Sequence, residues 1–202
     1  MENRLIHISA TKLALWFNRY VGKEGLEFQK LVLGIEILII NVSKFIIMYT
    51  LAALLGTLWQ TAILHIAYIP IKRYSFGLHA LNSTVCTIVS CSMFVLMPWL
   101  LRGAGISNIA VIAAFAPIIV CFYRYAPADT KYRPLVGAKL RKELKLKAVV
   151  CGIALMAIAL LIPNPHIKLL LTLGAVYQCI AILPLTYKLL KRSERNYETY
   201  EK

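Results

Sequence analysis

Hydrophobic residues dominate six stretches of the chain, and polar or turn-forming residues separate them. A helix needs about 20 apolar residues to cross a bilayer, so the pattern predicts six transmembrane helices. Turn residues support the divisions, with Gly103 and Gly105 after the third stretch and Pro163 and Pro165 after the fifth. The predicted spans are 32–56, 58–71, 82–101, 106–123, 148–162 and 167–187.

The first 30 residues follow a different pattern, in which apolar residues recur at helical spacing with basic residues between them. Leu13, Trp16 and Tyr20 belong to the apolar set, and Lys12 and Arg19 lie between its members. The segment lacks the continuous apolar core of a signal peptide. It predicts an amphipathic helix, either lying in the membrane interface or packed on the rest of the protein.

The composition agrees with a membrane protein. Of the 202 residues, 59% are hydrophobic and 16% are charged, against roughly 45–50% and 25% in a soluble domain. The fold class expected is therefore an all-α polytopic membrane protein, which excludes a soluble or a disordered chain. We expect one domain over 1–202, with an interfacial segment at 1–30, a six-span core at 31–187 and a basic tail at 188–202.

The positive charges are distributed unevenly across the predicted spans. The net charge is +14, and 20 of the 23 Lys and Arg residues fall on the side that holds both termini, against two on the opposite side. Positive residues accumulate on the cytoplasmic side of membrane proteins. We therefore expect both termini in the cytoplasm and anionic membrane lipids as partners. Nucleic acid is not an expected partner, because the basic residues lie between membrane segments.

Two ionisable residues, Glu36 and Lys44, fall inside the first predicted span. Charges at membrane depth are costly and face protein or water. The two residues are eight positions apart, or about 12 Å along a helix, so they cannot pair directly. They belong either to a transport path or to separate structural contacts.

The segment at the start of the third span carries candidate chemistry. It reads Lys-Arg-Tyr-Ser-Phe-Gly-Leu-His-Ala-Leu-Asn-Ser-Thr-Val-Cys over 72–86. A thiol nucleophile needs a base or a positive field to form its thiolate. His79 is a candidate base for Cys86, and Lys72 and Arg73 are candidate sources of positive field. The alternative is that His79 is a structural residue and Cys86 an inert packing residue.

Helix geometry limits how His79 and Cys86 can meet. Positions seven apart share a helix face but lie about 10.5 Å apart along the axis. Direct contact therefore requires a non-helical backbone near 77–82. We expect Asn82 or Ser83 to cap the helix that carries Cys86, and both are also candidate oxyanion donors.

A second polar segment follows the fourth predicted span and reads Tyr-Arg-Tyr-Ala-Pro-Ala-Asp-Thr-Lys-Tyr-Arg-Pro-Leu over 123–135. Its prolines and its Asp-Thr pair predict a structured turn. Asp129 is a candidate either to cap a helix or turn or to orient His79 as the third member of a triad. Lys131 and Arg133 are candidates for holding an acidic peptide. The alternative is a solvated loop that only sets topology.

These two segments, in this order, resemble the accessory gene regulator B (AgrB) family. Gly77-Leu-His-Ala with Cys86, the Tyr-Ala-Pro-Ala-Asp-Thr run and Arg-Pro-Leu carry the resemblance, together with the stretch up to Lys44. Many members also have two basic residues where Lys72 and Arg73 stand. Many have two glycines where this chain has Phe76 and Gly77, so a stiffer segment is expected here.

The resemblance implies a bacterial, multi-pass cell-membrane cysteine endopeptidase of quorum sensing. Such a protein cuts the C-terminal part from a small AgrD-like propeptide and helps to form a cyclic thiolactone or lactone signal. It implies Cys86 as nucleophile and His79 as base, with Lys72, Arg73, Lys131 and Arg133 as candidate substrate contacts. A homodimer is also implied, whereas no metal or other cofactor is expected.

Other functions remain compatible with the residues. One is a non-catalytic membrane transporter or peptide-export scaffold, in which Glu36 and Lys44 matter and Cys86 does not. Another is a cysteine acyltransferase, which would use the same Cys86 and His79 with an acyl donor. Export of the finished peptide is compatible as an added role.

Overall fold

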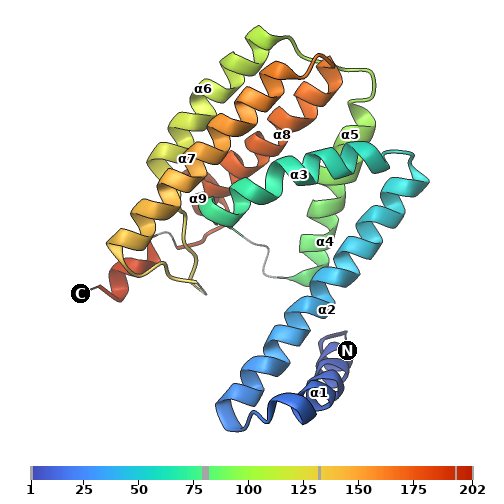
Figure 1. Cartoon of the computed structure of the whole chain (residues 1–202), viewed down its shortest axis with the longest axis vertical. Coiled ribbons are helices and arrows are strands. Elements are labelled where there is room, and N and C mark those ends of the chain that lie inside the picture. The colour runs from blue at the N-terminus through green and yellow to red at the C-terminus, as the bar shows by residue number, and fades with distance from the viewer. Residues whose placement is uncertain (1, 79–81, 132, 194, 202) are drawn as a thin grey trace.

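The computed structural model of the chain describes residues 2–78, 82–131, 133–193 and 195–201. The described part is helical (Figure 1), and its extended pairing consists of two isolated bridges, Phe76 with Ala128 and Thr130 with Arg133. The elements are α1 (Glu2–Val21), α2 (Gly25–Leu54), α3 (Leu58–Ser75), α4 (Ser83–Cys91), η1 (Ser92–Leu96), α5 (Met97–Leu100), α6 (Asn108–Tyr125), α7 (Ala138–Leu161), α8 (Pro165–Ile182), α9 (Pro184–Leu189) and η2 (Asn196–Thr199).

Five helical stretches are long and apolar enough to cross a membrane, which fits a multi-pass membrane protein. They are α2, the continuous stretch Ser83–Leu100 formed by α4, η1 and α5, and the helices α6, α7 and α8. The expected helix over 58–71 does form, as α3, but it is not among these five. One face of α3 is buried and includes the polar residues Thr61, His65 and Ser75, whereas Trp59 and Ile66 on α3 are exposed.

The helices α3, α6, α7 and α8 enclose the main hydrophobic core. Phe115 and Phe122 of α6 and Ala175 of α8 are fully buried there. α3 and α8 approach closely at Gly174, where an added Cβ would lie 2.9 Å from Cβ of Ala67. Figure 1 shows α6, α7 and α8 side by side, with α3 crossing beside them. This group holds the C-terminal end of α3 in place.

A second group of helices extends from this core (Figure 1). α1 packs on α2 through Ala10 and Ala14, and His7 of α1 pairs with Glu36 of α2. The N-terminal helix is therefore confirmed, and it packs on the protein itself, while Trp16 and Tyr20 stay exposed. Glu36 has a structural partner, as one of the two interpretations of its charge expects.

The stretch that begins at α4 is interrupted by a π-helical turn, η1. Tyr177 of α8 donates a hydrogen bond to the Met93 carbonyl at 2.9 Å, and Thr61 of α3 donates to the Phe94 carbonyl at 2.8 Å. A π-turn alters the regular helix hydrogen bonds, and side chains from α3 and α8 bond to its carbonyls. These two bonds connect α3, α8 and the helix that carries Cys86.

Three of the predicted boundaries are wrong. The first spanning helix begins at Gly25 instead of 32. The fifth helix begins at Ala138 instead of 148, since the basic segment before 148 consists largely of Lys, Arg, Leu and Glu, which are good helix formers. The sixth ends at Ile182 instead of 187, because Pro184 cannot continue the hydrogen-bond ladder of α8 and starts α9.

Candidate functional site

Residues 76–78, here called the connector, lead from α3 toward His79. The backbone leaves the helix at Phe76, with φ of 57°, and at Gly77, with φ of 96°. The Gly77 N–H donates to the Ala128 carbonyl at 2.8 Å, and the Leu78 N–H donates to the Ala181 carbonyl at 3.0 Å. The connector is therefore held between the 126–135 segment and the end of α8.

Gln178 of α8 fixes the start of the connector. Its side-chain amide is fully buried and donates to Ser75 Oγ at 2.6 Å and to the Phe76 carbonyl at 2.8 Å. Sequence reasoning missed this residue. The sequence did contain an indication of its role, because Gln178 is a polar residue inside an apolar predicted span. Burying a polar group there without a hydrogen-bond partner is energetically unfavourable.

Lys72 follows the predicted span 58–71 and lies between the connector and Cys86. Its Nζ donates to the Leu78 carbonyl at 3.3 Å and lies 6.0 Å from the centre of the Tyr68 ring. Burial lowers the pKa of Lys72 to about 8, and the charge of a Cys86 thiolate acts in the opposite direction. Lys72 is thus near enough to Cys86 for their charges to interact, whereas Arg73 is exposed.

Cys86 lies in the first turn of α4 and is half-buried. The Asn82 side chain accepts a hydrogen bond from the Thr84 N–H at 2.9 Å, so the predicted helix cap is confirmed and is Asn82 instead of Ser83. The non-helical backbone predicted near 77–82 is confirmed at Gly77, Leu78 and Asn82, the described residues of that range. His79 lies outside the described residues, so its contact with Cys86 stays a prediction.

Asp129 is buried and binds the C-terminal tail. Its Oδ1 accepts from the Asn196 N–H at 3.0 Å, and its Oδ2 accepts from the Tyr197 N–H at 2.8 Å. The carboxylate therefore caps η2, in line with one of the two roles expected for it. Orientation of His79 by Asp129 stays a prediction, and both carboxylate oxygens already have described partners.

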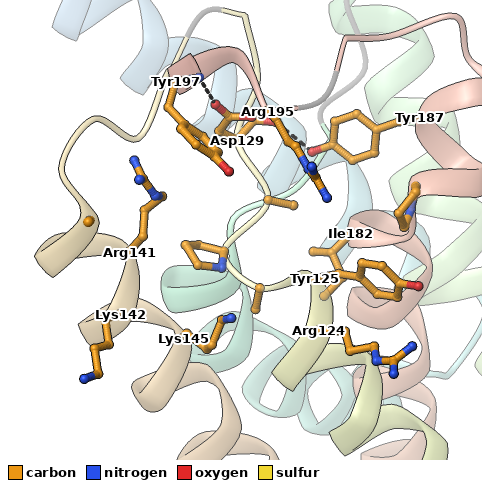
Figure 2. A pocket seen from close by; sticks show the side chains of 15 residues that line it. Arg124, Tyr125, Asp129, Arg141, Lys142, Lys145, Ile182, Tyr187, Arg195 and Tyr197 are labelled. Atoms are coloured by element: carbon orange, nitrogen blue, oxygen red, sulfur yellow. Dashed lines mark hydrogen bonds between the residues drawn. The ribbon is translucent and has the colours of Figure 1, made fainter. Parts of the chain in front are cut away.

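A basic pocket lies between the 124–129 segment, the start of α7 and the tail (Figure 2). Its volume is about 550 Å³. The cationic residues that line it are Arg124, Arg141, Lys142, Lys145 and Arg195. Asp129 is the acidic residue among the lining residues, and its oxygens face the tail. The pocket therefore carries an excess of positive charge.

The basic residues predicted to hold a peptide lie elsewhere. Lys131 and Arg133 are exposed and do not line the pocket. The Arg133 guanidinium lies 4.7 Å from the centre of the Phe76 ring, which places it over the connector. The pocket was not predicted, because its residues come from positions 124 to 197 and share no local motif.

Comparison with known proteins identifies the family. The family model for accessory gene regulator B matches residues 10–182. An AgrB-like protein of Listeria innocua is 47% identical over 174 residues, which cover 86% of this chain and 85% of the relative. An AgrB-like protein of Clostridium acetobutylicum is 42% identical, with 96% and 92% covered.

Accessory gene regulator protein B of Staphylococcus intermedius is 33% identical over 183 residues, covering 90% of this chain and 95% of that protein. No solved structure matches the chain. The matched region includes the connector, Lys72, Cys86 and the 123–135 segment, and leaves out the tail beyond residue 182. The chain therefore belongs to the accessory gene regulator B family.

Proposed function

We propose that this chain is a membrane cysteine endopeptidase that cleaves the C-terminal segment from a small AgrD-like propeptide and promotes cyclisation of the remainder. The observation that carries the proposal is the position of Lys72. Its ammonium interacts with the charge of Cys86 and donates to the carbonyl of Leu78, the residue before His79. A cation beside a thiol favours the thiolate, which is the nucleophilic form.

The proposed reaction begins with His79 taking the Cys86 proton. The thiolate attacks the scissile carbonyl, so a C–S bond forms and the C–N bond breaks, and His79 protonates the leaving amine. A thiol or hydroxyl of the bound peptide then attacks the thioester. It forms the thiolactone or lactone, and Cys86 regains its proton.

The cap of α4 narrows the choice of oxyanion donors. The Thr84 N–H bonds to the Asn82 side-chain oxygen, and the Cys86 N–H bonds to the Asn82 carbonyl at 2.9 Å. Both are therefore occupied. The Asn82 side-chain Nδ2 and the Ser83 hydroxyl remain the candidate donors for a negative oxygen near Cys86.

We propose the six-span topology with residues 58–71 of α3 as the second span, both termini in the cytoplasm and the active site on that side. The distribution of Lys and Arg supports it, because removing α3 from the count breaks the alternation of basic and non-basic sides. A second copy of the chain and anionic lipids stay proposed partners.

The proposed function is tested by co-expression with a candidate AgrD-like propeptide, followed by intact mass analysis. A peptidase that cyclises its product releases the C-terminal fragment and a peptide one water lighter than the linear acid. A transporter or scaffold leaves the propeptide uncut, and an acyltransferase adds an acyl mass. Either of the last two results would overturn the proposal.

Lys72 leads to a prediction about pH. Because the Lys72 ammonium loses its proton above pH about 8, the rate of cleavage is expected to fall there as the positive field disappears. Lys72→Met should lower the rate about tenfold at pH 7, since it removes the positive charge that favours the nucleophilic thiolate. Lys72→Arg should retain activity and move the alkaline decline upward, because arginine stays charged.

The measurement is the rate of propeptide cleavage in membranes from pH 6 to 10. The Lys72→Met profile provides the control, because it lacks the titrating group and should show no decline near pH 8. An unchanged alkaline decline in both variants would show that another group produces it.

A further inference from the structure

The tail of the chain places a carboxylate at the rim of the basic pocket. Glu201 Oε1 accepts from Arg141 Nη1 at 2.6 Å and from the Gly137 N–H at 2.7 Å, and its Oε2 accepts from Arg141 Nη2 at 2.9 Å. These bonds hold the pKa of Glu201 below its ordinary value. The arrangement is a two-pronged arginine–carboxylate contact with an additional backbone donor.

Arg141 is held in position by groups other than Glu201. Its Nη1 also donates to the Leu135 carbonyl at 2.9 Å, and its guanidinium carbon lies 3.9 Å from the centre of the Tyr197 ring. Tyr197 is itself fixed by the bond from its N–H to Asp129. The Leu135 bond lies outside the tail and orients the arginine fork independently of Glu201, which reduces the ordering cost of binding.

The positive charges that line the pocket outnumber the negative charge that Glu201 of the tail brings to it. Arg124, Lys142 and Lys145 line it beside Arg141, and Figure 2 shows their side chains around the same hollow. A single Glu201 carboxylate cannot neutralise this set. A longer acidic segment than the tail would be favoured at this surface.

The pocket shares its wall with the connector. Ala128 lines the pocket, and its carbonyl accepts from the Gly77 N–H while its N–H donates to the Ser75 carbonyl at 2.9 Å. Ile182 lines it too, next to the Ala181 carbonyl that holds Leu78. A peptide bound in the pocket would contact the residues that fix the segment leading to His79.

We propose that this pocket binds peptide carboxylates, and that Glu201 occupies the place of an acidic residue from the C-terminal segment of the propeptide. The identity of that peptide rests on the proposed function. A peptide is favoured over a phosphate group because the bound example is a carboxylate of the chain itself, held by the Arg141 fork and the Gly137 N–H. The tail then acts as a tethered competitor that an incoming peptide displaces.

The test measures binding of a fluorescent synthetic peptide with the sequence of residues 196–202 to the full chain in a zwitterionic detergent. Tethered ligands compete at effective concentrations that reach millimolar values. The Glu201→Gln variant should therefore bind the probe at least about tenfold more tightly than the native chain. Adding Arg141→Ala to this variant should weaken binding about tenfold or more, and Arg141→Lys should weaken it as well, because lysine lacks the fork.

The matched control is Lys139→Ala in the Glu201→Gln background. Lys139 is an exposed basic residue on the same first turns of α7 and does not line the pocket, so binding should not change. A probe with glutamine in place of both glutamates should fail to bind. Equal binding of that probe, or equal binding after Arg141→Ala, would overturn the proposal.

Two further experiments complete the test. The first distinguishes a peptide site from a phosphate site, and the second separates failure of this proposal from failure of the proposed function. Displacement of the probe by millimolar inorganic phosphate or by phosphatidylglycerol vesicles, together with binding of the glutamine probe, would assign the pocket to phosphate groups and reject the peptide site. In cleavage assays, Arg141→Ala should raise KM for the propeptide and Glu201→Gln should lower it, with kcat unchanged. If no variant cleaves anything, the proposed function fails, whereas the binding data still decide the carboxylate site.

Discussion

Replacing Cys86 with alanine is expected to abolish propeptide cleavage, lowering kcat/KM by at least about 10³-fold, because removal of a nucleophile leaves only substrate binding and polar stabilisation. Cys86 lies in the first turn of α4, after the Asn82 cap, within range of the charge on Lys72. His79→Ala should give a loss of similar size, since the two residues act as a unit. The measurement is the rate of fragment release at matched amounts of protein in the membrane.

The matched control is Cys91→Ala. Cys91 is on the same helix, five residues further along, and is half-buried like Cys86. It has no proposed role in the reaction, so cleavage should continue at the native rate. A peptide adduct on Cys86, trapped by rapid denaturation and located by mass, would identify the acyl-thioester. Persistent cleavage by Cys86→Ala would show that the nucleophile is a different residue.

Gly77→Ala is expected to lower the rate of cleavage by about 10²-fold or more, because misplacing a catalytic segment by about 1 Å has an effect of that size. An added Cβ at Gly77 would lie 2.8 Å from the Ala181 carbonyl oxygen and 2.9 Å from Ile182 Cγ2. The backbone must then shift, and the bonds of the connector to Ala128 and Ala181 lengthen or break. The measurement is the rate of cleavage together with the thermal stability of the purified protein.

Gly103→Ala is the control that separates backbone strain from steric clash as the cause of a lower cleavage rate. Gly103 has a positive φ of 80°, like the 96° of Gly77, but an added Cβ there would meet no atom within 4 Å. Gly103→Ala therefore experiences the backbone strain alone, on the order of 1–3 kcal/mol, far from the connector in sequence. It should lose some stability and little activity. Equal losses of activity in both variants would contradict a steric cause.

Helix α3 shows how far the hydrophobic pattern predicts the structure. Its apolar residues predicted a helix over 58–71, and a helix forms over Leu58–Ser75. The polar residues His65 and Thr61 are buried, because His65 packs on rings of α2 and η1 and Thr61 donates a hydrogen bond to η1. Hydrophobic periodicity identifies a helix but does not show which of its faces packs on other helices.

The backbone conformation of Phe76 is a second feature that the local sequence does not predict. Its φ of 57° is unusual for a residue other than glycine. Its carbonyl bonds to Gln178 and its ring packs under Arg133. Contacts from residues far along the chain therefore hold a conformation that the local sequence disfavours.

Features that depend on neighbouring residues could be predicted from the amino-acid sequence alone. These are the helical class, the apolar stretches, the cap at Asn82 and the family motif around Cys86. Each follows from a spacing of a few residues, because helix period, capping and hydropathy act over one or two turns.

Contacts between residues far apart in the sequence are seen only in the tertiary structure. Gln178 bonds to Ser75, Asp129 to Tyr197, and Arg141 to Glu201, at separations of 103, 68 and 60 residues. Such pairs depend on which helix faces pack together, and many pairings satisfy the same local pattern. The basic pocket and the anchoring of the connector arise from that packing, because their polar groups must find partners once water is excluded.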